Sequence, residues 1–139
     1  MKYLFEWTPA ISVDDKKIDG QHQRLLGQVN TLLSYIISEK NDVMISDAIV
    51  FLDKYINEHF AYEEMYMDEH KFPDIEDHIK FHKDFIKHYK DFKEKFEAGV
   101  SRESLALEIE QYIGNWWLTH IAVEDHKYAE FIKYNEHKA

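Results

Sequence analysis

Residues 75–96 read IEDHIKFHKDFIKHYKDFKEKF, and a histidine or an apolar side chain recurs in them every three or four residues. This spacing places one set of side chains on a single face of an α-helix: Ile75, His78, His82, Phe85, Tyr89, Phe92 and Phe96. Asp74 is a candidate N-cap, and Gly99 stands where a left-handed C-terminal cap is expected. The stretch therefore predicts a helix whose inward face carries two histidines.

Three further stretches show the same periodicity: about 19–38, about 43–70, and a last one that begins after Ser101. Asp19 and Ser101 are candidate N-caps, and Pro73 requires a turn before the third helix. The inward faces carry His22, Leu25, Leu26, Val29, Leu32, Leu33 and Ile36; then Ile45, Ile49, Leu52, Ile56, His59, Glu63 and Met67; then Leu105, Ile109, Tyr112, Ile113, Trp116 and His120.

Short turns between long helices favour antiparallel neighbours, so we expect an all-α, up-down-up-down four-helix bundle. The whole chain, residues 1–139, is expected to form one domain, with an extended N-terminal arm over 1–18 and the bundle over 19–134. Trp7 is the residue expected to anchor the arm.

Composition agrees with this fold and narrows the function. Only six of 139 residues are Gly or Pro, which suits long helices. The formal net charge of -10 argues against nucleic acid or an anionic membrane as a partner. The absence of cysteine excludes thiolate metal sites and disulfides, and it makes a cytoplasmic location the default expectation.

Five histidines occupy positions where the helical pattern calls for Leu or Ile: His22, His59, His78, His82 and His120. A single histidine on an apolar face is usually a hydrogen-bonded core residue. Five of them in one core are costly to bury unless each has a partner, and a metal ion supplies a partner to several at once.

The spacing of these residues supports a metal site. His59 and Glu63 are four residues apart, as are His78 and His82, so each pair projects from one helix face. Imidazole with carboxylate suits iron, zinc, copper or nickel. Five imidazoles and two carboxylates exceed what one tetrahedral zinc uses, which favours a carboxylate-bridged dinuclear centre.

Four motifs together resemble the hemerythrin family, most closely its bacterial single-domain branch: DGQHQRL at 19–25, HFAYEE at 59–64, FP at 72–73 followed by HIKFH at 78–82, and WLTHIAVED at 117–125. The resemblance covers roughly residues 5–132. It implies a non-haem di-iron centre of Fe2+/Fe3+ ions with an oxo or hydroxo bridge. One iron would be held by His78, His82 and His120 and the other by His22 and His59, with Glu63 and Asp125 bridging.

The family pattern and helix geometry disagree at the last ligand. Asp125 follows His120 by five residues, which on an ideal α-helix is a rotation of about 140°. Glu124 would share the face of His120. The family pattern favours Asp125, so we predict a π-bulge or a break in the helix between them.

An apolar pocket for dioxygen is expected from side chains one helical step from a ligand, although each of them could equally be plain core: Leu25, Phe60, Trp116, Trp117 and Ile121. The remaining histidines, His70, His88, His126 and His137, are expected at the surface or behind the ligands, and Glu64 likewise.

The resemblance implies reversible dioxygen binding for storage, transport or delivery, with an oxygen-consuming enzyme as the expected recipient. We do not expect an enzyme, because no histidine has a Glu three residues before it, the signature of carboxylate-rich di-iron enzymes. The alternatives are an oxygen or redox sensor, or a di-iron enzyme that acts on peroxide or nitric oxide.

Overall fold

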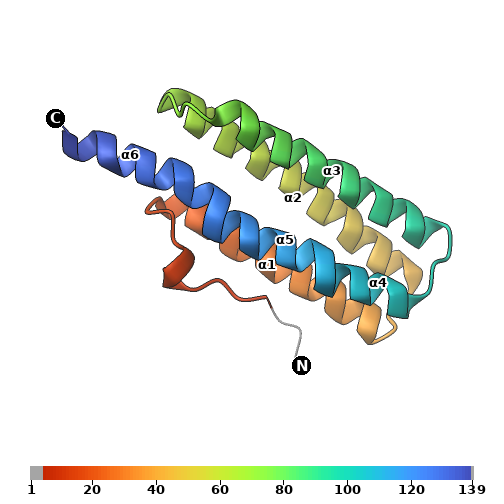
Figure 1. Ribbon diagram of the computed structural model, residues 1–139. Coiled ribbons are helices and arrows are strands. Elements are labelled where there is room, and N and C mark those ends of the chain that lie inside the picture. The colour runs from red at the N-terminus through yellow and green to blue at the C-terminus, as the bar shows by residue number, and fades with distance from the viewer. Residues whose placement is uncertain (1–4, 139) are drawn as a thin grey trace.

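The computed structural model describes residues 5–138, with side chains described through residue 136. It confirms the antiparallel four-helix bundle (Figure 1). A short 3-10 turn, η1 (Pro9–Ile11), lies in the arm, and the first three long helices are α1 (Lys16–Ile37), α2 (Asp42–Glu69) and α3 (Ile75–Glu97). The fourth helix is continuous but changes its winding four times: α4 (Arg102–Glu108), η2 (Ile109–Ile113), α5 (Gly114–Thr119), η3 (His120–Asp125) and α6 (His126–Lys138).

Helix ends follow local capping, with two corrections to the sequence expectation. α1 begins at Lys16, because the Asp15 carboxylate accepts the Ile18 N–H and forms the N-cap that was expected at Asp19. Asp74 precedes α3 but its side chain makes no capping hydrogen bond. Ser101 does cap α4, and Gly99 ends the turn after α3 with φ of 82°.

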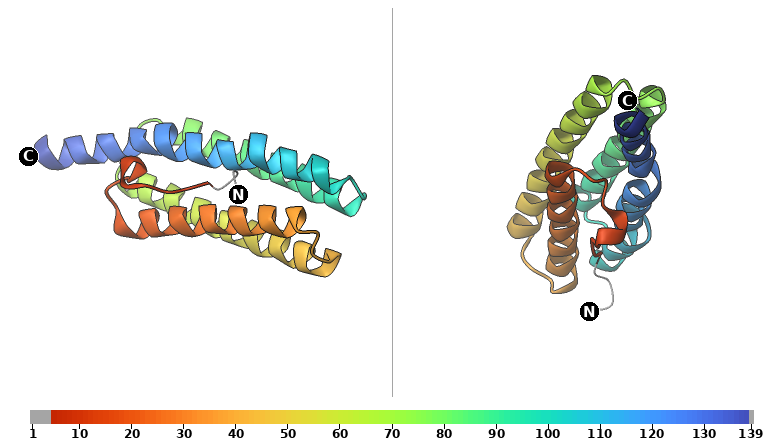
Figure 2. Two further views of the ribbon diagram at one scale, coloured as in Figure 1. Left: turned by 90° about the horizontal axis from the view of Figure 1, so that it is seen from below. Right: turned by 90° about the vertical axis from the view of Figure 1, so that its left-hand side faces the viewer.

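Each helix buries its apolar face against two neighbours. α1 packs on α2 and on the fourth helix, and α3 also packs on α2 and on the fourth helix. Viewed end-on, the four helices surround a shared interior (Figure 2). The histidine layer divides the buried apolar residues into a large cluster that includes Leu25, Phe85 and Trp117, and a smaller one that includes Ile18 and Tyr128.

The arm lies along the bundle and is anchored at Phe5 rather than at Trp7. The Phe5 backbone N–H donates to Asn30 Oδ1 at 2.7 Å, and Asn30 Nδ2 donates to the Phe5 carbonyl at 2.8 Å. The Phe5 ring is buried over Gly114, where a Cβ would coincide with it. Trp7 is only half-buried against the same core, and residues 1–4 of the arm lie outside the described residues.

No helix within residues 5–138 combines the length and the hydropathy that crossing a membrane requires.

Candidate metal centre

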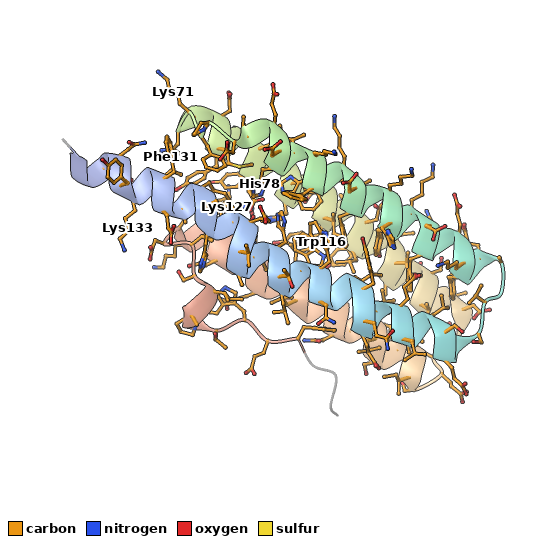
Figure 3. All side chains as sticks on the ribbon, viewed as in Figure 1. Lys71, His78, Trp116, Lys127, Phe131 and Lys133 are labelled. Atoms are coloured by element: carbon orange, nitrogen blue, oxygen red, sulfur yellow. The ribbon has the colours of Figure 1, made fainter. Side chains whose placement is uncertain are left out.

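All seven side chains singled out from the sequence meet in the interior of the bundle, and all are buried. Every long helix contributes to them: α1 gives His22, α2 gives His59 and Glu63, α3 gives His78 and His82, and η3 gives His120 and Asp125. Figure 3 shows His78 between α3 and the fourth helix, pointing into the bundle. The helical periodicity therefore brings together groups that are up to 103 residues apart (125 − 22).

The Glu63 carboxylate faces two groups of histidines at once. Its Oε1 lies 2.9 Å from His82 Nε2 and 3.1 Å from His78 Nε2. Its Oε2 lies 3.5 Å from His22 Nε2 and 3.5 Å from His59 Nε2. One carboxylate oxygen thus belongs to each side of the cluster.

Asp125 repeats this arrangement from the opposite helix. Its Oδ1 lies 2.9 Å from His78 Nε2 and 3.0 Å from His120 Nε2, whereas its Oδ2 lies 3.0 Å from His22 Nε2. Glu124 is half-buried and pairs with Lys127 at 3.0 Å instead. The π-helical segment η3 covers His120–Asp125, so the predicted distortion of the helix between these residues is confirmed.

The donor atoms form two sets that share one carboxylate. The larger set comprises Glu63, His78, His82, His120 and Asp125, and the smaller comprises His22, His59 and Glu63. Within each set the donor atoms lie within 4.8 Å of one another. This arrangement can hold two metal ions with carboxylates between them.

Despite the short N···O distances above, several buried donor atoms make no hydrogen bond of suitable geometry with any residue that the structure describes, although polar atoms inside a protein rarely lack a partner. They are the Nε2 atoms of His22, His59, His82 and His120 and both carboxylate oxygens of Asp125. Metal ions would satisfy all of these atoms together, and the imidazole and carboxylate donors suit iron. The residues present therefore fit a di-iron centre.

Burial and the mutual contacts shift the pKa values of these groups in opposite directions. Burial alone lowers the pKa of His22 and His78, but contact with Asp125 and Glu63 outweighs it and raises both to about 9. Burial lowers the pKa of His59 to about 3. Burial would raise the pKa of Asp125, but the imidazoles around it hold it well below its usual range. In the metal-free cluster His22 and His78 therefore bind protons that a metal ion must displace.

Three side chains behind the donors were given no ligand role by the sequence pattern. Glu64 Oε2 accepts from His82 Nδ1 at 2.8 Å, and Gln21 Oε1 accepts from His59 Nδ1 at 2.7 Å. Tyr128 Oη donates to Glu63 Oε2 at 2.9 Å. Glu64 was expected at the surface or behind the ligands, and it lies behind His82. Gln21 adjoins the ligand position His22 in the sequence, which is the one signal that could have suggested it.

Aromatic rings surround the cluster. Phe60 stacks on His82 with ring centroids 3.8 Å apart and lies 6.0 Å from His59, and Trp117 lies 5.9 Å from His59. Trp116 stacks on His120 at 4.4 Å. Leu25 and Ile121 are fully buried in the same apolar cluster as Phe60 and Trp117.

The other histidines lie outside the cluster of seven buried side chains. His70 ends α2 against the Tyr66 ring, and His88 stacks on Tyr112 with centroids 3.7 Å apart. His126 is half-buried at the start of α6, and the side chain of His137 lies outside the described residues.

Comparison with known proteins gives one consistent result. The family model of the hemerythrin HHE cation binding domain matches residues 13–132. A bacteriohemerythrin of Stenotrophomonas maltophilia is 28% identical over 130 residues, covering 94% of this chain and 82% of that protein. A myohemerythrin of Theromyzon tessulatum is 28% identical over 124 residues, covering 89% and 90%. A crystal structure of a leucine-to-tyrosine hemerythrin mutant superposes with a TM-score of 0.80 at 25% identity, covering 94% of this chain and 98% of that one.

Proposed function

The chain belongs to the hemerythrin family, and from this premise we propose that it binds dioxygen reversibly at a di-iron centre, for storage, transport or delivery. His78, His82 and His120 would hold one iron, His22 and His59 the other, and Glu63 and Asp125 would bridge the two. When bound, the iron pair would supply two electrons to dioxygen and take them back when the gas is released, so that binding is reversible.

One observation carries this proposal: each carboxylate has one oxygen toward the three-histidine side and one toward the two-histidine side. A mononuclear site would not need donors split in this way. The two-histidine side has one imidazole fewer, and we place dioxygen binding there.

The surrounding side chains have a separate task. Trp117 lies beside His59, Phe60 stacks on His82 and also faces His59, and Leu25 and Ile121 extend the same apolar surface. Such a lining admits a small neutral gas and disfavours water and larger polar reductants. Trp116 covers His120 and therefore the three-histidine side.

The direct test is spectroscopic. The protein is loaded with ferrous iron without oxygen, exposed to oxygen and then degassed, and the visible spectrum is recorded at each stage. We expect two irons per chain and a charge-transfer band that appears and disappears with the gas. A protein that stays colourless contradicts the proposal.

Replacement of His59 tests the placement of dioxygen. His59→Ala should abolish the oxygen-dependent band while the circular dichroism remains helical. His88→Ala is the matched control, because His88 stacks on Tyr112 rather than on the cluster. Normal oxygen binding by His59→Ala would show that the site is misassigned.

A carrier and an enzyme differ in turnover. Both central carboxylates contact histidines of the cluster, so neither is free to act as a general acid or base. We therefore propose a carrier, and expect reductant consumption under air to be no faster than autoxidation. Rapid multiple turnover with peroxide or nitric oxide would favour the enzyme.

A further inference from the structure

The two sides of the cluster differ in the hydrogen-bond acceptors of the histidine Nδ1 atoms, which face away from the cluster. A ligating imidazole uses one nitrogen for the metal, and the hydrogen bond at its other nitrogen sets its strength as a ligand. At His82, Nδ1 donates to the carboxylate of Glu64 at 2.8 Å. At His59, Nδ1 donates to the neutral amide oxygen of Gln21 at 2.7 Å. A charged acceptor makes the imidazole the stronger donor to a metal.

His22 increases this difference. Its Nδ1 is buried without a hydrogen-bond partner among the described residues. The two-histidine side therefore has one neutral acceptor behind its imidazoles, whereas the three-histidine side has a carboxylate.

The charged residues near the surface also differ between the two sides of the cluster, with negative charge on the three-histidine side and positive charge on the two-histidine side. An acidic hollow of about 370 Å³ reaches His78, and its charged lining comprises Asp74, Asp77, Asp84 and Glu124 against Lys80 and Lys127. Figure 3 shows Lys127 beside His78. A basic hollow of about 280 Å³ reaches Gln21 between α1 and α2, and its charged lining comprises Lys16, Lys17 and Arg24.

Negative charge stabilises a ferric ion relative to a ferrous ion, and positive charge does the reverse. The acidic hollow and Glu64 lie on the three-histidine side, and the basic hollow and Gln21 lie on the two-histidine side. Hydrogen bonding and long-range charge thus act in the same direction.

We propose that Glu64 and Gln21 are positioning residues that, through His82 and His59, give the two irons unequal reduction potentials, the three-histidine iron having the lower one. This inference rests on the proposed di-iron function. Its consequence is that the ferric state forms first at the three-histidine iron, while the iron assigned to dioxygen remains ferrous.

Two opposite substitutions test it in the iron-loaded protein. Glu64→Gln removes the charged acceptor and should raise the potential of the three-histidine iron. Gln21→Glu introduces one and should lower the potential of the two-histidine iron. Each shift should change the ferric-to-ferrous ratio at fixed potential about tenfold, which is ~59 mV for one electron, measured by spectroelectrochemical titration.

Glu69→Gln is the matched control, since it removes the same charge from an exposed position of α2. The inference predicts shifts of opposite sign for Glu64→Gln and Gln21→Glu and almost none for Glu69→Gln. Two shifts of the same sign, or shifts no larger than in the control, overturn it even when the wild type binds oxygen. A wild type that takes up no iron overturns the proposed function as well, so the two failures are distinguishable.

The zinc-loaded protein provides a second readout that needs no iron redox chemistry. In its proton NMR spectrum, the Nδ1 proton of His82 should resonate farther downfield than that of His59, because its acceptor is charged. Glu64→Gln should move the His82 signal upfield, and Gln21→Glu should move the His59 signal downfield. Unchanged signals would show that these side chains do not act on the ligands.

Discussion

At the scale of single residues, Tyr128 connects the centre to the smaller apolar cluster. It is fully buried, and its hydroxyl donates to Glu63 Oε2 at 2.9 Å. Burial, together with the nearby Glu63 and Asp125 carboxylates, raises its pKa well above 10, so the donor keeps its proton at any physiological pH.

Tyr128→Phe should therefore weaken the centre without disturbing the packing. Loss of a hydrogen bond to a charged group costs about 1.5–3 kcal/mol, and we expect metal affinity to fall about 10–100-fold. Urea unfolding of the metal-free protein and a chelator competition measure these effects. Tyr134→Phe, at an exposed position, is the control. Equal behaviour of the two variants would refute the role of Tyr128.

The shifted histidines predict how pH affects the metal-free protein. The folded pKa values of His22 and His78, about 9, lie above the ordinary 6.5. Their contribution to the free energy of unfolding is therefore complete below pH 6.5 and is lost as pH rises through 9. His59, with a folded pKa of about 3, has the opposite effect, and stability falls as pH drops below 6.5.

Urea midpoints of the metal-free protein should thus decline by the equivalent of a few kcal/mol, on the order of 1.4 per pKa unit, between pH 6.5 and 9. Metal loading should remove this decline, because the metal replaces the protons. A flat profile without metal would contradict the pKa assignment.

Residues with a helical signature could be predicted from the sequence, and residues defined by contacts between helices could not. His22, His59 and His120 stand out because each interrupts an apolar face. Gln21 and Tyr128 do not interrupt an apolar face, so the helical pattern does not single them out. Their contacts with His59 and Glu63 depend on how α1 and α6 are rotated toward α2 in the folded bundle.

At the scale of elements, the winding of the fourth helix decides which acid faces the cluster. In a π-helix the hydrogen bonds close five residues apart, so Asp125 takes the place above His120 that Glu124 would hold in an α-helix. The family pattern made η3 predictable. Nothing in the sequence pattern indicated the second π-helical segment, η2, and the structure offers no local reason for it.

Asp125→Asn and Glu124→Gln separate the two acids. Asp125→Asn should reduce the metal bound after anaerobic loading at least tenfold, because it removes a bridging charge from between three imidazoles. Glu124→Gln should keep full stoichiometry, because it removes only a surface pair with Lys127. Circular dichroism checks that both variants are helical. The reverse outcome would move the ligand to Glu124.

The start of α1 shows why capping is difficult to predict among several acids. Asp14, Asp15 and Asp19 all precede or open the helix. The Asp19 side chain binds the arm instead of capping the helix, because its carboxylate accepts hydrogen bonds from Ser12 Oγ at 2.6 Å and from the Val13 N–H at 2.9 Å. The N-cap therefore moves to Asp15, one turn earlier.

At the scale of the whole molecule, the arm joins the beginning of the chain to its fourth helix through Phe5 and Gly114. Gly114→Ala should destabilise the protein by about 1–3 kcal/mol, because the new Cβ meets the buried ring. In a Phe5→Ala background the same change should become neutral or stabilising by up to ~1 kcal/mol, as expected for Ala in a helix. A double-mutant cycle measured by thermal unfolding shows the reversal of sign. The same cost in both backgrounds would mean that the arm does not dock there.

The π-helical turn at His120–Asp125 also has a meaning for redesign. Deletion of one residue from an α-helix normally rotates everything downstream by about 100°. Here one turn already contains a supernumerary residue, so excision of the exposed Val123 would straighten the helix and keep Tyr128 and Ile132 on their present side. The loss of a single codon would thus remove the π-helical turn and preserve the scaffold, and Asp125 would then follow His120 by four residues and stay on its face. A graft of this centre onto an ideal bundle therefore needs the acid four residues after the histidine instead of five.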